Sequence, residues 1–297
     1  MRILEGKTLS AQILGALPAR IEAVRARLGR PPSLAIINYF PDSPSAVYVR
    51  RKTAACEKLG IATKLFSPEG GYEAFKHLLA ALGEDPAYDA IMVERPLPDG
   101  FETLETWDSL PAAKDVDGLS TLNMGRLAII RRFSEVETSG FFVPCTALAV
   151  IRLMEFHGIK PSGMNIAIAG RSAVVGRPLA YMLTALDATV TLCHTRSKNI
   201  SGIFKASDLV ITAIGRAGWL QKEMLAPGTT VIDVGTNFDA AGKMCGDADF
   251  EGLKQTAAAA TPVPGGVGPV TMACLIEAAV KAAELAPKTV KGEIALT

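Results

Sequence analysis

Short apolar runs alternate with amphipathic stretches along nearly the whole chain. This alternation is typical of βα units, and a series of such units predicts a parallel sheet covered by helices. A kink is expected at Pro18, inside the first predicted helix. In the first half of the chain the pattern predicts strands at 33–39, 61–66 and 90–93 and helices at 9–28, 45–59 and 72–82.

A second α/β series follows a less regular stretch, from about Gly118 to Pro144, which we expect to link two domains. The long helix that ends the pattern is expected at 271–285, with Thr271 as its N-cap. The expected fold class is therefore α/β, with two α/β domains. The strands of the second series are predicted at 165–169, 189–193, 209–213, 230–234 and 258–261, and its other helices begin near Thr146, Gly176 and Asn199.

Composition narrows the classes of function. The 31 Lys and Arg residues nearly balance the 30 Asp and Glu residues, and no basic block occurs, so no nucleic-acid partner is expected. No apolar run is long enough to span a membrane, and charged residues interrupt the N-terminus where a signal peptide would lie. The cysteines include no CxxC pair and the histidines are isolated. We therefore expect no metal site, no disulfide framework and a cytoplasmic location.

A glycine-punctuated loop, Gly170 to Pro178, joins the strand predicted at 165–169 to the helix that begins near Gly176. Between a strand and a helix, such a loop lets backbone N–H groups and the helix N-terminus approach a phosphate closely. Glycine also ends strands for steric reasons alone. A nucleotide cofactor is nevertheless the leading hypothesis for this loop.

The end of the next strand indicates which nucleotide is bound. An acidic side chain there would accept a hydrogen bond from the ribose 2′-hydroxyl of NAD. The segment Cys-His-Thr-Arg-Ser-Lys stands there instead and contains no carboxylate. Arg196, with Thr195 and Ser197 beside it, suits a 2′-phosphate, and Arg171 could reach the same group. The alternative is that Arg196 and Lys198 are solvated loop residues, but the pattern favours NADP.

Candidate catalytic residues lie in the first half of the chain. Tyr48 and Lys52 share one face of a predicted helix, and a partly desolvated Lys52 could act as an acid or a base. The alternative is a solvated basic helix surface. Glu94 follows the strand predicted at 90–93, at the edge where open α/β sheets bind ligands.

Further polar and thiol groups have two interpretations each. Asp115 and Asp117 are either ligand contacts or turn residues, because the second is followed by Gly118 and Asp-Gly is a common turn pair. Cys145 could be a nucleophile, but no histidine lies near it in the sequence. We therefore expect Cys145 to be a buried small hydrophobic residue.

Several motifs then occur in a characteristic order along the chain. They are Tyr48-Val49-x-x-Lys52, Pro96-Leu97-Pro98, Lys114-Asp115-Val116-Asp117-Gly118, Pro144-Cys145-Thr146, Gly170-Arg171-Ser172-x-x-Val175-Gly176-x-Pro178 and Thr261-Pro262-Val263-Pro264-Gly265-Gly266-Val267-Gly268-Pro269. On these motifs the chain resembles the bifunctional methylenetetrahydrofolate dehydrogenase/cyclohydrolase family over essentially its whole length. The last motif is the most specific of the set.

The resemblance implies two domains with a folate cleft between them. Residues 1–142, completed by a helix at 270–297, would form the catalytic, folate-binding domain, and residues 143–269 would form a Rossmann-like NADP-binding domain. The family reaction removes hydride from 5,10-methylenetetrahydrofolate onto NADP and hydrolyses the methenyl product to 10-formyltetrahydrofolate. The resemblance further implies a cytoplasmic homodimer that serves one-carbon metabolism and purine biosynthesis.

The resemblance implies a role for each residue of this chain that matches a position in the family's motifs. Lys52 resembles the family's catalytic lysine, which transfers a proton in the hydrolysis. Tyr48 resembles the residue that stacks on the aminobenzoyl ring, Asp117 resembles the carboxylate that holds the pterin, and Glu94 stands where a glutamine usually tunes the lysine. The resemblance implies substrate contacts also at Pro264, Gly265 and Gly268, and cofactor contacts at Gly170, Arg171, Ser172, Val175, Gly176, Pro178, Thr195, Arg196, Ser197, Gly235, Gly265 and Gly266.

Departures from the family pattern gather on the presumed folate side, which could therefore be specialised. Because a carboxylate favours the ammonium form of a nearby lysine, Glu94 is expected to weaken the hydrolysis; alternatively, Glu94 points away and pairs with Arg95 or Arg51. On that side the departures are Glu94-Arg95 for the usual Gln-Leu, Phe40-Pro41 for a usual glycine, and Arg50 and Arg51 beside the lysine; Ala147, which replaces a usual proline, lies outside it.

Three functions stay open at this point. The first is an NADP-dependent folate dehydrogenase, with or without cyclohydrolase activity. The second is a related dehydrogenase that acts on a different pterin or a modified folate. The third is a non-catalytic NADP-binding protein, against which the retention of Lys52, Tyr48 and Asp117 argues.

Overall fold

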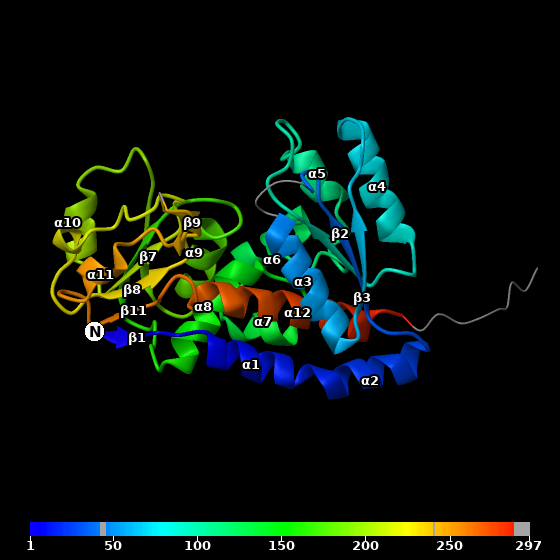
Figure 1. Ribbon diagram of the computed structural model, residues 1–297, viewed down its shortest axis with the longest axis horizontal. Coiled ribbons are helices and arrows are strands. Elements are labelled where there is room, and N and C mark those ends of the chain that lie inside the picture. Colours follow the sequence, from blue (N-terminus) through cyan, green and yellow to red (C-terminus); the bar gives the residue numbers. More distant parts are fainter. Residues whose placement is uncertain (42–45, 240, 288–297) are drawn as a thin grey trace, which may run out of the picture. The chain divides into compact units, whose positions relative to one another are not determined.

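The computed structural model describes residues 1–41, 46–239 and 241–287, apart from the side chains of residues 46–48. Its contacts divide the chain into two compact units (Figure 1). Unit 1 comprises residues 1–13, 123–139 and 143–274, and unit 2 comprises residues 14–122, 140–142 and the chain from residue 275.

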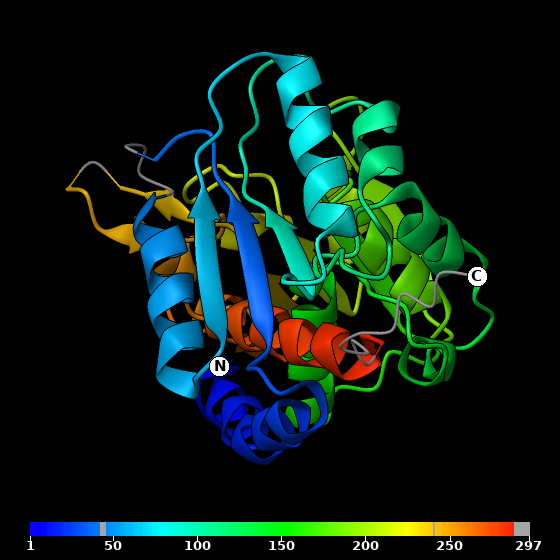
Figure 2. The same ribbon diagram turned by 90° about the vertical axis from the view of Figure 1, so that its right-hand side faces the viewer.

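Unit 2 is built on a three-stranded parallel sheet in the order β3-β2-β4. The central strand β2 is buried along its whole length, because α3 and α4 flank the sheet on opposite sides (Figures 1 and 2). The strands and helices predicted for this part of the chain are confirmed. They are β2 (Ser33–Ile37), α3 (Ala46–Leu59), β3 (Ala62–Phe66), α4 (Tyr72–Glu84) and β4 (Ala90–Val93), followed by α5 (Leu104–Ser109).

Unit 1 contains a six-stranded sheet in the order β1-β11-β8-β7-β5-β6, whose neighbouring strands all run parallel. Both neighbours of β5 follow it in the chain, so the strand order reverses there, and doubly wound folds bind ligands at such a point. The elements are β1 (Arg2–Ile3), α8 (Cys145–Phe156), β5 (Asn165–Ala169), α9 (Gly176–Thr184), β6 (Thr189–Cys193), α10 (Ile200–Lys205), β7 (Leu209–Thr212), η1 (Lys222–Met224), β8 (Thr230–Asp233), the hairpin β9 (Asn237–Phe238) and β10 (Met244–Cys245), α11 (Phe250–Leu253) and β11 (Ala259–Ala260).

Some features differ from the sequence predictions. Strand β1 pairs with β11, so residues 1–13 group with unit 1. The stretch at 118–144, expected to be an irregular linker, contains two helices, α6 (Thr121–Ile129) and α7 (Ser134–Thr138). Thr271 is not an N-cap, because it lies inside α12 (Val267–Leu285) and its hydroxyl donates back to Val267 O.

The first helix predicted from the sequence is two helices, α1 (Lys7–Gly15) and α2 (Leu17–Leu28), with Pro18 in the first turn of α2. Proline is tolerated there because the first N–H groups of a helix have no partner within it. The predicted kink at Pro18 is therefore a helix break. It sets the start of α2, which carries the contacts to α12.

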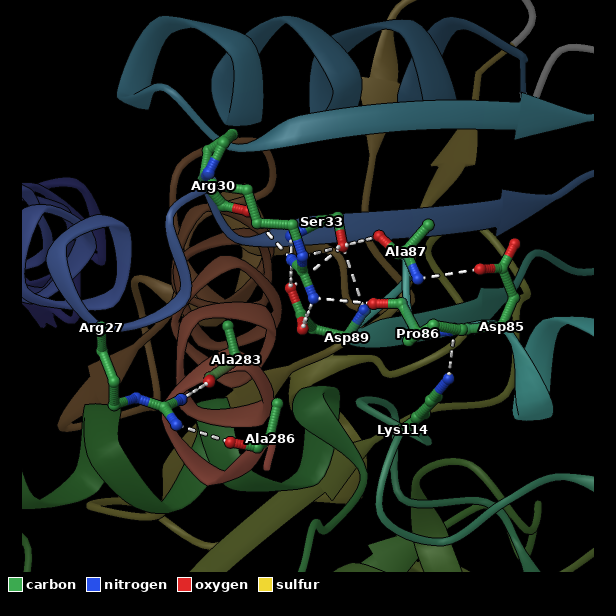
Figure 3. Close-up of polar contacts among 11 residues, drawn as sticks. Arg27, Arg30, Ser33, Asp85, Pro86, Ala87, Asp89, Lys114, Ala283 and Ala286 are labelled. Carbon is green, nitrogen blue, oxygen red and sulfur yellow. Dashed lines mark hydrogen bonds and ion pairs between the residues drawn. The ribbon is translucent and has the colours of Figure 1, made fainter. Parts of the chain in front are cut away.

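Helix α2 anchors the C-terminal part of α12, which groups with unit 2. Arg20 pairs with Glu284 at 2.8 Å, and Arg27 donates to the carbonyl oxygens of Ala283 and Ala286 (Figure 3). Cations at a helix C-terminus satisfy carbonyl groups that lack intrahelical partners and complement the helix dipole. Residues 288–297, which the predicted C-terminal helix also included, lie outside the described residues.

A buried ion pair holds the amino-terminal edge of the small sheet. Arg30 donates two hydrogen bonds to the carboxylate of Asp89, both at 2.7 Å, and Asp89 is 3% exposed (Figure 3). The N–H and hydroxyl of Ser33, at the start of β2, donate to the same carboxylate. Nearby, Lys114 donates to the carbonyl oxygen of Asp85, just past α4, at 2.7 Å. These contacts tie the start of β2 to the start of β4.

Replacing Arg30 by Ala is expected to lower the free energy of unfolding by about 3 kcal/mol, because the Asp89 carboxylate then stays buried without its cation. Lys254→Ala is the matched control, since it removes an exposed pair with Glu251 and should cost less than about 1 kcal/mol. Urea unfolding of both variants measures the difference. Equal and small losses would show that the Arg30–Asp89 pair contributes little to stability.

Candidate active site

The carboxyl-terminal edge of the small sheet carries an ion pair that is largely buried. Lys52 of α3 donates to Glu94 Oε2 at 2.7 Å, and the two side chains are 16% and 10% exposed. Glu94 directly follows β4, and its backbone N–H continues the strand ladder to Ile37 O at 2.8 Å. The fold thus brings together two candidates that are far apart in the sequence.

The alternative partners of Glu94 are oriented elsewhere. The guanidinium of Arg95 lies 5.1 Å from the centre of the Trp107 ring, and its Nε is 3.6 Å from a carboxylate oxygen of Glu102. Arg51 is exposed on α3. The alternative in which Glu94 pairs with Arg95 or Arg51 is therefore wrong, and so is the alternative of a wholly solvated face on α3.

Tyr48 belongs to α3, one turn before Lys52. Because the two positions are four residues apart on one helix, their Cβ atoms lie on the same face. The side chain of Tyr48 lies outside the part of the chain that the structure describes. Its contact with a folate ring therefore stays a prediction.

Asp115 and Asp117 have different surroundings. Asp115 is 1% exposed, and its Oδ2 accepts the Ser120 N–H at 2.7 Å. Its backbone also bridges to Ile91 of β4, so it fixes the turn beside the sheet. Asp117 is only partly buried. Of the two carboxylates, Asp115 has a structural role, and Asp117 stays the candidate for a ligand contact.

The loop between β5 and α9 has the shape of a phosphate cradle. Gly170 has φ +119°, and a Cβ atom at Gly176 would collide with the Gly170 carbonyl oxygen, so no larger residue fits at either position. Ser172 Oγ accepts the Val175 N–H at 3.1 Å. Pro178 occupies the first turn of α9, where no N–H is needed. The backbone can therefore approach a pyrophosphate at the helix N-terminus, and these residues fit a dinucleotide.

The turn after β6 is held by its own side chains. The His194 N–H donates to Ser197 Oγ at 2.9 Å, and the Ser197 N–H donates back to His194 O at 2.8 Å. The Arg196 N–H donates to His194 Nδ1 at 3.1 Å. The side chains of Thr195 and Arg196 are exposed, as is Arg171 of the glycine loop. The sequence analysis did not single out His194, because only the folded turn shows that its ring positions the backbone of Arg196.

The segment 261–269 leads from β11 into α12. Gly265 has φ +110°, a conformation that favours glycine. Gly266 packs tightly against the preceding turn, where a Cβ atom would lie 2.7 Å from a backbone carbonyl oxygen. Pro264 and Gly268 are exposed. The loop therefore presents backbone and a proline ring rather than long side chains.

Two buried carboxylates that the sequence analysis did not single out organise the loops at the carboxyl edge of the large sheet. Asp233, 3% exposed, accepts the N–H groups of Gly235, Asp247 and Ala248 at 2.8–3.0 Å. Asp247 is fully buried and accepts the N–H groups of residues 214–216. Burial raises the pKa of Asp233 to about 6. Asp233 therefore holds Gly235, a predicted cofactor residue, in place, and its one sequence signal is its position at the end of a strand.

The described residues contain neither a metal-binding cluster nor a membrane-spanning helix. Within them, no cluster of His, Cys, Asp and Glu side chains could hold a metal ion, and no helix has the length and apolar character needed to cross a membrane. The five cysteines, all among the described residues, form no disulfide bond. Cys145 is 2% exposed at the start of α8, so the prediction of a buried small residue is confirmed.

The chain matches two family models. Residues 4–117 match the catalytic domain of tetrahydrofolate dehydrogenase/cyclohydrolase, and residues 144–286 match the NAD(P)-binding domain of the same family. Among curated proteins, it is 46% identical over 277 residues to Bifunctional protein FolD of Elusimicrobium minutum, covering 93% of this chain and 96% of that protein. It is 40% identical to the protein of the same name from Azoarcus sp., covering 95% and 96%.

Solved structures give the same result. The chain is similar to the bifunctional FolD methylenetetrahydrofolate dehydrogenase/cyclohydrolase of Campylobacter jejuni, with a TM-score of 0.88 and 36% identity over 96% of this chain and 99% of the other. It is also similar to the Trypanosoma brucei dehydrogenase-cyclohydrolase, which was solved with NADP cofactor and inhibitor. That match has a TM-score of 0.85 and 32% identity over 95% and 97% of the two chains.

The raised pKa of Asp233 predicts a pH dependence of stability. Between the ordinary value of 3.8 and about 6, the folded protein binds a proton that the unfolded chain has released, so this group's contribution to stability falls as the pH rises. The unfolding free energy of the wild type, relative to that of Asp233→Asn, should therefore be higher at pH 5 than at pH 8 by about 1.4 kcal/mol. Chemical unfolding at both pH values measures it, and a constant difference would contradict the assignment.

Proposed function

The chain belongs to the tetrahydrofolate dehydrogenase/cyclohydrolase family, and we propose that unit 2 binds the folate and unit 1 binds the nucleotide. The enzyme oxidises 5,10-methylenetetrahydrofolate to 5,10-methenyltetrahydrofolate with NADP, and hydrolysis of that product to 10-formyltetrahydrofolate is the family's second activity. The observation that carries this conclusion is that both family domains match one chain, in which Lys52 is partly desolvated at the ligand edge of a parallel sheet.

The nucleotide contacts are proposed from the fit of the residues in unit 1. NADP, when bound, supplies the acceptor for the hydride. The glycine loop with Ser172 would hold the pyrophosphate through backbone N–H groups. Arg196, Ser197 and Arg171 would hold the 2′-phosphate, because guanidinium and hydroxyl groups donate to its oxygens and no carboxylate stands in the turn to repel it.

The folate contacts are proposed from unit 2. Asp117 would accept hydrogen bonds from N–H groups of the pterin, and Tyr48 would stack on the aminobenzoyl ring. Pro264, Gly265 and Gly268, on the loop before α12, are proposed as further substrate contacts. Hydride transfer mainly needs the two reacting rings to be held in position, so these residues would serve binding and orientation.

Lys52 would carry the proton chemistry. Hydrolysis of the methenyl group requires water to lose a proton, and a neutral amine can take it. In the structure the lysine is paired with Glu94 at 2.7 Å, so its Nζ must leave this ion pair before it can take a proton from water. We propose that this ion pair slows the hydrolysis and leaves the dehydrogenation largely intact.

The decisive assay uses purified protein with NADP and 5,10-methylenetetrahydrofolate. NADPH formation, followed by its absorbance, supports the proposed function. NADP binding without turnover would instead support a dehydrogenase for another pterin, or a non-catalytic NADP-binding protein. Hydrolysis is followed separately, from the loss of added methenyltetrahydrofolate in the absence of NADP.

The setting of the enzyme is proposed on the family resemblance. We propose a homodimer in the cytoplasm that supplies one-carbon units for purine biosynthesis. Sedimentation of the purified protein would test the dimer, since a monomer at micromolar concentration would exclude it.

Arg196→Ala is expected to weaken NADP binding by about 1.5–3 kcal/mol, because it removes a charge-assisted hydrogen bond to the 2′-phosphate. NAD lacks that phosphate, so its affinity should change little. Lys205→Ala, at an exposed position at the end of α10, is the control for a general loss of positive charge. Titration with both nucleotides measures the effect, and equal losses for NAD and NADP would refute the assignment.

Glu94→Gln is expected to raise the rate of methenyltetrahydrofolate hydrolysis several-fold, because a neutral amide no longer holds the Lys52 side chain in an ion pair. NADPH formation should change little. Glu102→Gln is the control, since Glu102 is a more exposed carboxylate paired with Arg95 rather than with Lys52. Unchanged or slower hydrolysis in Glu94→Gln would show that Glu94 does not restrain the lysine.

A further inference from the structure

Asn38 carries a buried hydrogen-bond donor for which the described residues supply no acceptor. The residue directly follows β2 and is 2% exposed, and within the described part of the chain its Nδ2 has no hydrogen-bond partner. Buried polar groups are nearly always paired, because an unpaired donor loses its bonds to water without replacement. A donor kept unpaired at the ligand edge of a sheet therefore calls for a partner from outside the protein.

The orientation of this amide is set by its other end. Asn38 Oδ1 accepts the Phe40 N–H at 3.1 Å, and a flipped amide would place two donors against each other there. The backbone N–H of Asn38 donates to Phe66 O of β3 at 2.8 Å, which keeps the residue in line with the strand. The Nδ2 group therefore has a fixed direction and cannot rotate to find a protein acceptor.

The strand register places Asn38 beside Glu94. Ile37 of β2 is paired with Val93 of β4, and both side chains belong to the core on the α4 side. The next residue on each strand therefore points to the opposite face, about 4.8 Å from its neighbour in the backbone. Lys52 of α3 reaches Glu94 on that face. An amide donor, a carboxylate and an ammonium group thus emerge together at the carboxyl edge of the sheet.

We propose that Asn38 is a substrate-binding residue whose Nδ2 donates to an uncharged acceptor of the folate, a carbonyl oxygen or a ring nitrogen. The proposal rests on the proposed function of this site. Glu94 offers only acceptors, and Lys52 carries a charge that the carboxylate already balances. Asn38 is the neutral donor next to this pair, so it recognises a neutral acceptor without disturbing the balance of charge. The unpaired donor lowers the stability of the free enzyme, and the bound ligand supplies the missing hydrogen-bond acceptor.

The test is Asn38→Leu, which has a similar size and no donor. The KM for 5,10-methylenetetrahydrofolate should rise about five-fold or more, the effect of one lost hydrogen bond, while the KM for NADP stays unchanged. The melting temperature should stay the same or rise, because a buried unpaired donor is gone. Asn237→Leu is the matched control: its Nδ2 already donates to Asp247 at 2.9 Å, so that variant should melt at a lower temperature.

Asn38→Ser, which keeps a shorter donor, should give an intermediate KM for folate. It still tests the proposal if the leucine variant does not fold. An unchanged folate KM in both variants would overturn the proposal. Equal losses of affinity for folate and NADP, with a lower melting temperature, would also overturn it and make Asn38 structural. If the wild type forms no NADPH, the proposed function fails instead. Direct titration of tetrahydrofolate into wild type and Asn38→Leu then decides the role of Asn38, since equal affinities overturn it.

Discussion

Parallel strand pairing determines where polar chemistry gathers in this protein. Each strand must return through a helix before its parallel neighbour begins, so all strands of a sheet end at the same edge. In the small sheet this places Asn38 and Glu94 side by side. In the large sheet it gathers the glycine loop after β5, the turn after β6 and the loop after β8 at one edge. Residues that are remote in the sequence become neighbours through this constraint alone.

Buried polar groups at the two edges of the small sheet differ in how completely they are hydrogen-bonded. At the amino-terminal edge, the Asp89 carboxylate accepts hydrogen bonds from Arg30 and from the backbone and hydroxyl of Ser33. These hydrogen bonds replace the hydration that the buried carboxylate has lost, so the cluster stabilises the fold. At the carboxyl edge, no acceptor among the described residues pairs with Asn38 Nδ2. Incomplete pairing there keeps hydrogen-bonding capacity for a ligand, at a cost in folding free energy.

The Lys52–Glu94 pair connects the charge of the site to its two reactions. Hydride transfer depends on the placement of the reacting rings and requires no proton transfer by the lysine. A hydrolysis depends on a group that can accept a proton from water. Because Glu94 holds the lysine in an ion pair at 2.7 Å, we propose that this departure from the family pattern acts on the two activities unequally. The buried Asp233 and Asp247 have a separate task, since they hold backbone N–H groups of the loops beside the proposed nucleotide site.

The sequence alone predicts most of the strands and helices and the chemical groups of the site, because apolar periodicity and glycine positions are local signals. The ordered motifs also indicate the family and NADP. Local signals could not show that β1 joins the large sheet, since a two-residue strand is recognised by its partner β11 alone. They could not separate Asp115 from Asp117, because burial depends on what packs around each turn. Nor could they show that Glu94 pairs with Lys52 rather than with Arg95 or Arg51, or that Asn38 keeps a free donor beside them. Those facts depend on strand register and on the direction of each side chain, which exist only once the sheet has formed.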